Sequence, residues 1–430
     1  MEFSDIIILS ILLGCMATYV PVFLCLFSTA VLGFMIFTNV PLLLLAQTLL
    51  RSMDNFALVV VLFFILCGNI MTAGSIVQKL IDVANALLSW MPGGLGMAGV
   101  LACGLFGAIS GSTVATVVAL GGFMIPALLS NGYPEKYTLG LMTTSPNLGV
   151  IIPPSIGMIL YSMISNVSLE GLFLTGFLPG VLIMLSVCIY TYFFFRNKEE
   201  IVRLPMPGFR STLTVLRKGF WSLMLPVIIF GGIFSGAFTA NEAAVVACIY
   251  ALIVELFIHK SLKLGRVKDI VVSSAVTSAT LLIIVAGATC FGRLLTLESI
   301  PGRITEAVLS AINSPWVFLL VMNILLLIIG MFMDIISATM ILGPVFLPML
   351  DAFQVNPLHF GLIMTVNLAI GYCTPPMGVS LYITGSIAKR DLIYISKAVI
   401  PFIGIQIIVL LLITFFPDVV LWLPRMMGFI

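Results

Sequence analysis

Long apolar runs separated by short polar segments dominate the pattern of residues along this chain. A helix needs about 20 apolar residues to cross a bilayer, so the pattern predicts membrane-spanning helices. Residues 5–50 are expected to hold two spans, and a tight turn is expected near Gly236 to Asn241. The spans that can be placed individually are 54–73, 170–195, 220–238, 241–258, 270–291 and 392–416.

Two further apolar stretches, 97–130 and 316–351, are too long for one span and are interrupted midway. The first is interrupted by the run Ser110-Gly111-Ser112-Thr113, and the second by Gly330 and Asp334. In hydrocarbon, a backbone that leaves the helix is tolerated only where protein or a cavity surrounds it. Each stretch is therefore predicted to be a re-entrant hairpin of two half-spanning helices.

An apolar segment with a double proline follows each predicted hairpin. Pro153-Pro154 interrupts the segment 137–165, and Pro375-Pro376 interrupts the segment 358–386. Proline lacks an N–H and breaks the hydrogen-bond ladder of a helix, so both segments are predicted to be broken helices.

The two halves of the chain repeat each other. At one constant spacing, the matches are Gly121 with Gly343, Pro126 with Pro348, Met142-Thr143 with Met364-Thr365, Gly149 with Gly371, and Pro153-Pro154 with Pro375-Pro376. About five crossings in the first half, an odd number, would insert the second half upside down. The predicted fold is an all-α polytopic membrane protein with two inverted-topology repeats, each containing a re-entrant helical hairpin and a Pro-Pro-broken helix.

Composition agrees with this fold. Only 8% of the 430 residues are charged and 61% are hydrophobic, whereas soluble domains carry about 25% charged residues. The net charge is +2 and no basic run is interleaved with aromatic residues, which argues against a nucleic-acid partner. The eight cysteines occur singly and there are two histidines, so neither a zinc site nor a transition-metal cage is expected. The residues also contain no recognisable catalytic set, so an enzyme is disfavoured.

Basic residues predict the orientation and the domain boundaries. Lys and Arg concentrate in 196–218 and 260–268, which should be cytoplasmic by the positive-inside rule. The same rule puts Arg51 and the segment 298–306 outside. The predicted organisation is a first repeat at 1–195 with scaffold helices at 1–75, a cytoplasmic basic linker at 196–218, and a second repeat at 219–430 with scaffold helices at 219–269.

The hairpin tips and the proline breaks form the predicted binding site. N-termini of half-helices suit a carboxylate, and their C-terminal carbonyls suit a hard cation. Ser112 and Thr113 are expected to cap the second helix of the first hairpin, and Ser155 lies where a helix can restart after Pro154. The predicted oxygen ligands, a set that suits Na⁺ better than a transition metal, are Ser110, Ser112, Ser145, Asn147, Gly149, Gly330, Asp334, Thr365, Asn367, Gly371 and Thr374. Helix packing is the alternative role for such small and hydroxyl residues, but it does not explain why both halves repeat the same interruption.

Charges within or beside apolar segments are functional candidates, because a charge is expensive in hydrocarbon. Arg293 follows a long apolar run, and it could bind a substrate carboxylate or reach the outer interface. Asp334 could ligate Na⁺ or cap the second helix of its hairpin. Glu242 is interpreted as a first-turn acid at a helix start, and Asp54 as a solvated residue at the end of its segment.

These motifs resemble the large membrane subunit of tripartite ATP-independent periplasmic (TRAP) transporters. The resemblance covers almost the whole chain, and Asn241-Glu-Ala-Ala244 has Asn in place of the family's usual Thr. The stretches that carry it are Gly107 to Ser112, Met124 to Ala127, Asn131 to Tyr133, Asn147 to Ser155, Ser168 to Gly180, Gly330 to Asp334, His359 to Met364 and Asn367 to Gly378.

The resemblance implies Na⁺-coupled uptake of an organic acid across a bacterial inner membrane, by an elevator motion and with no cofactor besides the coupling ion. It also implies two partners, a small membrane subunit on a separate chain and a periplasmic substrate-binding protein. One sodium site would comprise Ser110, Ser112, Asn147 and Gly149, and the other Gly330, Asp334, Gly371 and Thr374; the substrate carboxylate would meet Arg293, Ser112, Thr113, Ser155 and Asp334.

The family commonly has a hydrophobic or aromatic residue near the position of Arg293, so the departure here favours a sugar acid such as a sialic acid over a C4-dicarboxylate. The alternative function is a stand-alone ion-coupled carrier or antiporter of the same fold, which would work without a binding protein.

Overall fold

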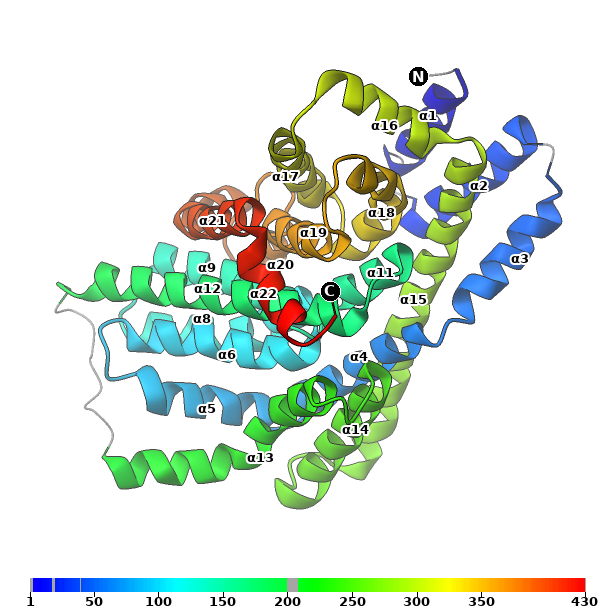
Figure 1. The fold of residues 1–430 in the computed structure, drawn as a ribbon. Coiled ribbons are helices and arrows are strands. Elements are labelled where there is room, and N and C mark those ends of the chain that lie inside the picture. Colours follow the sequence, from blue (N-terminus) through cyan, green and yellow to red (C-terminus); the bar gives the residue numbers. More distant parts are fainter. Residues whose placement is uncertain (1–2, 18–19, 39, 199–207, 430) are drawn as a thin grey trace.

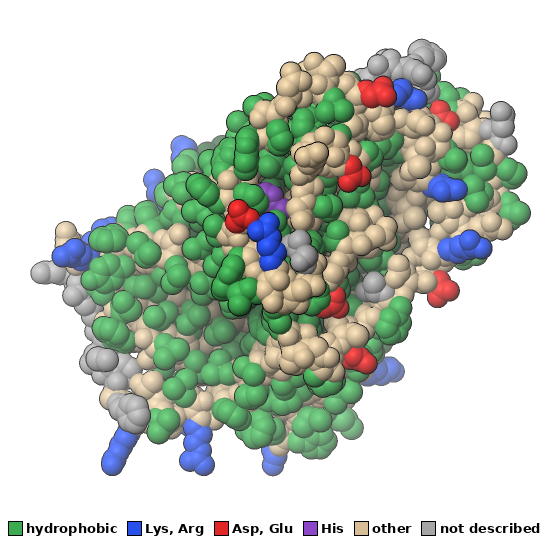
Figure 2. All heavy atoms as spheres, in the orientation of Figure 1, with side chains coloured by type: hydrophobic (Ala, Val, Ile, Leu, Met, Phe, Trp, Pro, Cys, Tyr) green, Lys and Arg blue, Asp and Glu red, His purple; other side chains and the backbone are tan. Residues whose placement is uncertain are grey.

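The computed structural model describes residues 3–17, 20–38, 40–198 and 208–429, and these residues form helices and connecting turns without strands. Within the described residues, nine helices are long and apolar enough to cross a membrane, or up to ten if one bent pair counts as a span. Hydrophobic side chains cover much of the surface, and basic side chains project along one edge of the molecule (Figure 2). The all-α membrane fold predicted from the sequence is confirmed.

The N-terminal region differs from its prediction. Residues 5–50 were expected to hold two spans, but they form three helices, α1 (Phe3–Ala17), α2 (Val22–Phe37) and α3 (Leu42–Met53). Pro21 and Pro41 are the N-cap residues of α2 and α3, because a proline and the residue before it cannot continue a helix. The third helix joins α4 (Ala57–Ala73) at a bend of 48°.

The basic segment predicted as a linker at 196–218 is partly helical. Residues 199–207 lie outside the described residues, and α13 (Phe209–Phe234) already begins before Arg210, Arg217 and Lys218. Arg and Lys have good helix propensity, so a helix can extend out of the membrane through them. α15 (Leu264–Leu297) likewise extends beyond the predicted span 270–291.

The turn expected between the two spans after the linker is confirmed. α13 ends at Phe234 and α14 (Ala240–Ile253) follows, with Gly236 at a φ of 72°. Thr239 and Glu242 form a reciprocal capping box at the start of α14, so Glu242 is a helix-start residue, as interpreted from the sequence. A π-helical turn, η3 (Val254–Ile258), continues α14.

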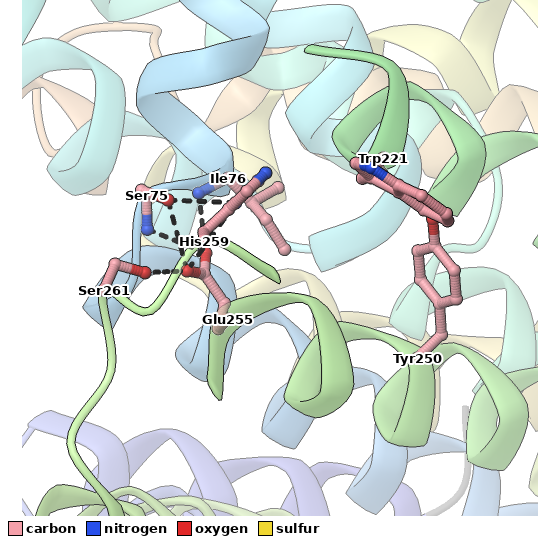
Figure 3. A network of polar contacts seen from close by, with 7 residues as sticks. All are labelled: Ser75, Ile76, Trp221, Tyr250, Glu255, His259 and Ser261. Carbon is pink, nitrogen blue, oxygen red and sulfur yellow. Dashed lines mark hydrogen bonds and ion pairs between the residues drawn. The ribbon is translucent and has the colours of Figure 1, made fainter. Parts of the chain in front are cut away.

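A buried carboxylate closes the corner between α4 and α5 (Ile76–Leu88), as Figure 3 shows. Glu255 in η3 is fully buried, and its Oε1 accepts hydrogen bonds from the backbone N–H groups of Ser75 and Ile76, each at 2.7 Å. Ser261 donates to Oε2, and His259 Nδ1 lies 3.0 Å from Ser75 Oγ. The Glu255 carboxylate thus replaces an N-cap side chain at the positive end of α5.

Both predicted hairpins are interrupted helices. The first comprises α6 (Gly94–Ser110), α7 (Thr113–Thr116), the π-helical η1 (Val117–Gly121) and α8 (Gly122–Ser130). The second comprises α17 (Pro315–Phe332) and α18 (Ile335–Ala352), preceded by α16 (Ile300–Ala311). The interruptions fall at the residues predicted from the sequence.

Both proline-containing segments are broken helices. The first comprises α9 (Glu135–Thr144), the 3₁₀ turn η2 (Ser145–Asn147), α10 (Leu148–Ile151) and α11 (Ile156–Ser165), and α12 (Leu169–Phe195) follows it. The second comprises α19 (Pro357–Gly371) and α20 (Val379–Ala388), followed by α21 (Leu392–Phe415) and α22 (Pro417–Met426). The peptide bonds Pro153-Pro154 and Pro375-Pro376 are both cis.

The elements form two groups around the long helix α15. α15 packs on α2, α3 and α4 on one side and on α18 on the other. Figure 1 shows α3, α4 and α15 running along one edge of the molecule, while the broken helices α9, α11 and α19 lie beside α12 and α21. The hairpins and broken helices are thus collected on one side of α15.

Candidate functional site

Equivalent glycine crossings in the two halves bring each hairpin against its broken helix. A Cβ at Gly107 would collide with the backbone of Gly149, and a Cβ at Gly371 would lie 2.6 Å from the Gly330 Cα. The two backbones can approach each other this closely only because none of the four glycines has a side chain. Each crossing lies within one helical turn of a hairpin tip, so the sequence repeat corresponds to a repeated packing contact.

The first hairpin tip is an N-capped helix start. Ser112 Oγ accepts the Ala115 N–H at 3.3 Å, which confirms its predicted capping role, and Gly111 has a φ of 61°. A Cβ at Gly149 would lie 3.0 Å from the Ser112 carbonyl oxygen, and one at Gly111 would lie 2.8 Å from the Pro154 carbonyl oxygen. The tip therefore contacts both sides of the first helix break.

Hydroxyl groups gather at this first tip. Ser110 Oγ lies 3.4 Å from Thr116 Oγ1, which donates to the Ser112 carbonyl at 2.7 Å. Thr113 Oγ1 and Ser145 Oγ are buried and have no hydrogen-bond partner in the described structure. The predicted capping role of Thr113 is therefore wrong, because Thr113 is the first residue of α7 and Ser112 already holds the N-cap position. Buried hydroxyls are almost always paired, so those of Thr113 and Ser145 have free hydrogen-bonding capacity for a water or a ligand.

The side chain of Asn147 points away from the hairpin. Its Nδ2 donates to Gln406 Oε1 at 2.9 Å, and Cys373 Sγ lies 3.2 Å from its Oδ1. This leaves the backbone of Asn147, more than its amide, as a possible ligand. Ser155 is fully buried, and its Oγ accepts the Met158 N–H at 3.4 Å as the N-cap of α11.

The second tip is capped by an acid. Asp334 Oδ2 accepts the Ser337 N–H at 2.9 Å, so the capping role considered for Asp334 is present. The Oγ of Ser337 is buried without a partner, a group that the sequence did not single out. Thr374 Oγ1 donates to the Ile370 carbonyl at 2.8 Å, just beyond the crossing at Gly371.

Two predicted ligands lie farther along α19. Thr365 donates to the Gly361 carbonyl at 2.8 Å, and six residues of helix separate it from Gly371, roughly 9 Å at a rise of about 1.5 Å per residue. Asn367 Nδ2 donates to the Ile363 carbonyl at 3.0 Å and to Asn323 Oδ1, while its own Oδ1 has no partner in the described structure.

Arg293 does not lie with the other predicted substrate residues. It is exposed on α15 and lines a cavity of about 730 Å³ between α3 and α15 on one side and α11 and α18 on the other. Ser112, Thr113, Ser155 and Asp334 do not line this cavity. Met340, the cavity residue of α18 nearest to Asp334, is six residues beyond it, so roughly 9 Å of helix separates the two.

The cavity has apolar walls and a positive rim. Its charged lining residues are Arg51 and Arg293, and no acidic side chain of the described residues lines it. Figure 2, in the orientation of Figure 1, shows both basic and acidic side chains on the side of the molecule where α3 and α15 lie. The uncharged lining residues are Leu44, Thr48, Ser52, Asn55, Met163, Ile164, Val285, Ala288, Thr289, Gly292, Thr296, Met340, Pro344, Leu347 and Pro348.

Comparisons with known proteins agree with this architecture. The family described as "Tripartite ATP-independent periplasmic transporter, DctM component" matches residues 9–419. The C4-dicarboxylate TRAP transporter large permease protein DctM of Rhodobacter capsulatus is 36% identical over 99% of this chain and 100% of its own length. The sialic acid TRAP transporter large permease protein SiaM of Vibrio cholerae is 34% identical over 92% of each chain.

A solved structure shares the fold. The crystal structure of the Alcanivorax borkumensis YdaH transporter superposes with a TM-score of 0.63 at 16% identity, covering 97% of this chain and 99% of that chain. At this identity the likeness concerns the fold alone.

Proposed function

We propose a mechanism of Na⁺-coupled transport for this chain, which belongs to the DctM component family of the tripartite ATP-independent periplasmic (TRAP) transporters. As a large permease subunit it is a multi-pass protein of the bacterial inner membrane, and it is a transporter, not an enzyme. Large permease subunits of this family work with a small membrane subunit and a periplasmic binding protein. The proposal concerns the coupling ion, the identity of the substrate and the movement that carries the substrate across the membrane.

The observation that carries the proposal is the repeated arrangement at the two hairpin tips. Each has a glycine crossing, an N-capped helix start and a buried hydroxyl oxygen without a partner, Thr113 and Ser145 in the first half and Ser337 in the second. Neutral oxygens with at most one carboxylate suit Na⁺. We assign one sodium site to Ser110, Ser112, Ser145, Gly149 and the Asn147 backbone, and the other to Gly330, Asp334, Gly371 and Thr374.

The cavity beside Arg293 is the proposed substrate site. A guanidinium binds a carboxylate in a bidentate pair, and Arg51 can neutralise a second negative group. The volume of about 730 Å³ lies in the range of about 300–1,000 Å³ typical of ligand pockets, which leaves room for a sugar acid such as a sialic acid as well as for a four-carbon diacid. The organic acid then occupies the boundary between α15 and the hairpin-bearing group.

That position supports an elevator mechanism. α11 and α18 line the cavity from the group that contains the hairpins, and α3 and α15 line it from the other group. If the hairpin group slides against α15, a substrate at the boundary is carried across while both sodium sites travel with it.

Reconstituted uptake tests the proposal. The chain is purified with its small subunit, placed in proteoliposomes, and supplied with radiolabelled N-acetylneuraminate or succinate, with and without a purified binding protein. We expect uptake only with an inward Na⁺ gradient and a loaded binding protein. Uptake driven by a pH gradient without Na⁺ or binding protein would instead support the stand-alone carrier.

A further inference from the structure

Gln406 of α21 connects the second half of the chain to the helix break of the first half. It is fully buried, and α21 packs along α9. Gln406 Nε2 donates to the Thr144 carbonyl at 3.0 Å, and its Oε1 accepts from Asn147 Nδ2 at 2.9 Å. Thr144 precedes the 3₁₀ turn η2 and Asn147 is its last residue, so one side chain holds both ends of that turn.

The Thr144 carbonyl loses its α-helical donor where the helix tightens into η2. In a continuous α-helix it would accept the N–H of Leu148, but here that N–H bonds to the carbonyls of Ser145 and Pro146 instead. In a 3₁₀ turn each carbonyl bonds to the N–H three residues on, so Thr144 keeps a partner of poorer geometry in Asn147 and has a lone pair free for a second donor. Gln406 supplies this second donor from a helix far away in the sequence.

Cys373 completes the arrangement from the second helix break. Its Sγ lies 3.2 Å from the Thr143 carbonyl oxygen and 3.2 Å from Asn147 Oδ1. Asn147 is therefore held through both atoms of its amide, by Gln406 and by Cys373. Its side chain is turned from the hairpin, and Gly149, two residues farther on, faces the Ser112 carbonyl.

We propose that Gln406 is a positioning residue of the first sodium site: it holds η2 so that the backbone of Asn147 and the hydroxyl of Ser145 face the first hairpin tip. This inference rests on the proposed function, because it assumes that Na⁺ binds there. Gln406 itself would not touch the ion. In the sequence it lies in an apolar helix of the second repeat, far from the first sodium site.

A purely structural role makes a different prediction. A buried amide pair that only stabilised the fold would change the amount of folded protein and its melting temperature when removed. A positioning residue also changes the Na⁺ concentration at half-maximal response, because the ligands of the ion shift. The Na⁺ titration is the readout that separates the two roles.

The experiment compares Gln406→Met, which keeps the volume and loses both hydrogen bonds, with Ile413→Ala on the same helix. Ile413 is fully buried, so its truncation destabilises the protein by leaving a cavity without touching η2. Two titrations are recorded for the purified complex: the melting temperature against NaCl with choline chloride as compensating salt, and Na⁺-driven uptake in proteoliposomes.

We expect the half-maximal Na⁺ concentration to rise at least fivefold in Gln406→Met and to stay within twofold of wild type in Ile413→Ala. If Gln406→Met does not fold, Gln406→Asn decides, since it keeps the amide on a side chain one methylene shorter and should give a smaller rise. An unchanged Na⁺ titration in the folded Gln406 variant overturns the inference. A wild-type protein that does not respond to Na⁺ at all overturns the sodium coupling itself.

Discussion

At the scale of single residues, Asp334 caps α18 and is proposed to ligate Na⁺, and one substitution can separate these two roles. Its carboxylate caps α18 through the Ser337 N–H, and an asparagine caps a helix about as well. Asp334→Asn should therefore keep the melting temperature of the protein but weaken the Na⁺ dependence of uptake by about tenfold, because the charge is lost. Asp334→Ala should lower both. If uptake by Asp334→Asn depends on the Na⁺ concentration as it does in the wild type, helix capping is the only function left for this residue.

Arg293 is the residue on which the substrate proposal depends. Arg293→Ala should abolish uptake while Na⁺ still raises the melting temperature of the protein, because the proposed sodium sites do not include Arg293. Arg293→Lys should recover little, since an ammonium cannot form the bidentate pair. Arg266→Ala, at the opposite end of α15, is the matched control. Normal uptake by Arg293→Ala would mean that the side chain only reaches the membrane interface.

At the scale of helices, the glycine crossings set the distance between each hairpin and its broken helix. A Cβ at Gly371 would lie 2.6 Å from Gly330 backbone atoms, whereas a Cβ at Gly122 in α8 would meet no atom within 4 Å. Gly371→Ala should therefore reduce uptake at least tenfold, and Gly122→Ala should leave it unchanged or stabilise the helix slightly. The comparison is made at equal amounts of reconstituted protein. Equal activity of the two variants would show that the crossing tolerates expansion.

Glu255 makes the corner between α4 and α5 a stability element. Glu255→Ala leaves the N–H groups of Ser75 and Ile76 buried without acceptors, at a cost of about 1–3 kcal/mol for each group. We expect a clearly lower melting temperature in detergent. Glu242→Ala serves as the control, because that capping carboxylate is exposed and water can replace it. A larger loss in Glu242→Ala than in Glu255→Ala would contradict this account.

At the scale of the whole molecule, the elevator proposal predicts which contacts must break during transport. A Cβ at Gly292 of α15 lies 3.9 Å from Pro344 Cβ of α18, and one at Gly343 lies 3.8 Å from Ile164 Cβ of α11. Both spacings suit a disulfide, whose Cβ atoms lie about 3.5–4.5 Å apart. Only the first pair joins the two groups of helices.

Oxidation of the double variant Gly292→Cys/Pro344→Cys should therefore block uptake, and reduction should restore it. The variant Gly343→Cys/Ile164→Cys is compared with its own reduced form, because Ile164 lines the cavity, and it should lose no further activity on oxidation, because α11 and α18 move together. Cross-linking is followed by the shift of the oxidised band in gel electrophoresis, and each single variant controls for the native cysteines. Uptake that continues with the first pair fully cross-linked would rule out sliding between α15 and α18.

Local patterns in the sequence were sufficient for the elements and for the hairpin tips. Apolar length predicted most spans, because the bilayer thickness sets that length. Proline and glycine predicted the breaks at Pro153-Pro154 and Gly111, because their effect on the backbone depends on no distant partner. The same local rules identified Ser112 as a cap, and the repeat showed that both halves share one design.

Only the tertiary structure decided which distant residues meet. It paired Glu255 with Ser75 and Gln406 with Asn147, and it placed Arg293 in a cavity apart from the hairpin tips. In a chain this apolar, every helix face is hydrophobic enough to be buried, so spacing along the sequence does not say which face packs against which helix. That choice depends on close packing and on satisfying each buried polar group, and both are properties of the assembled molecule.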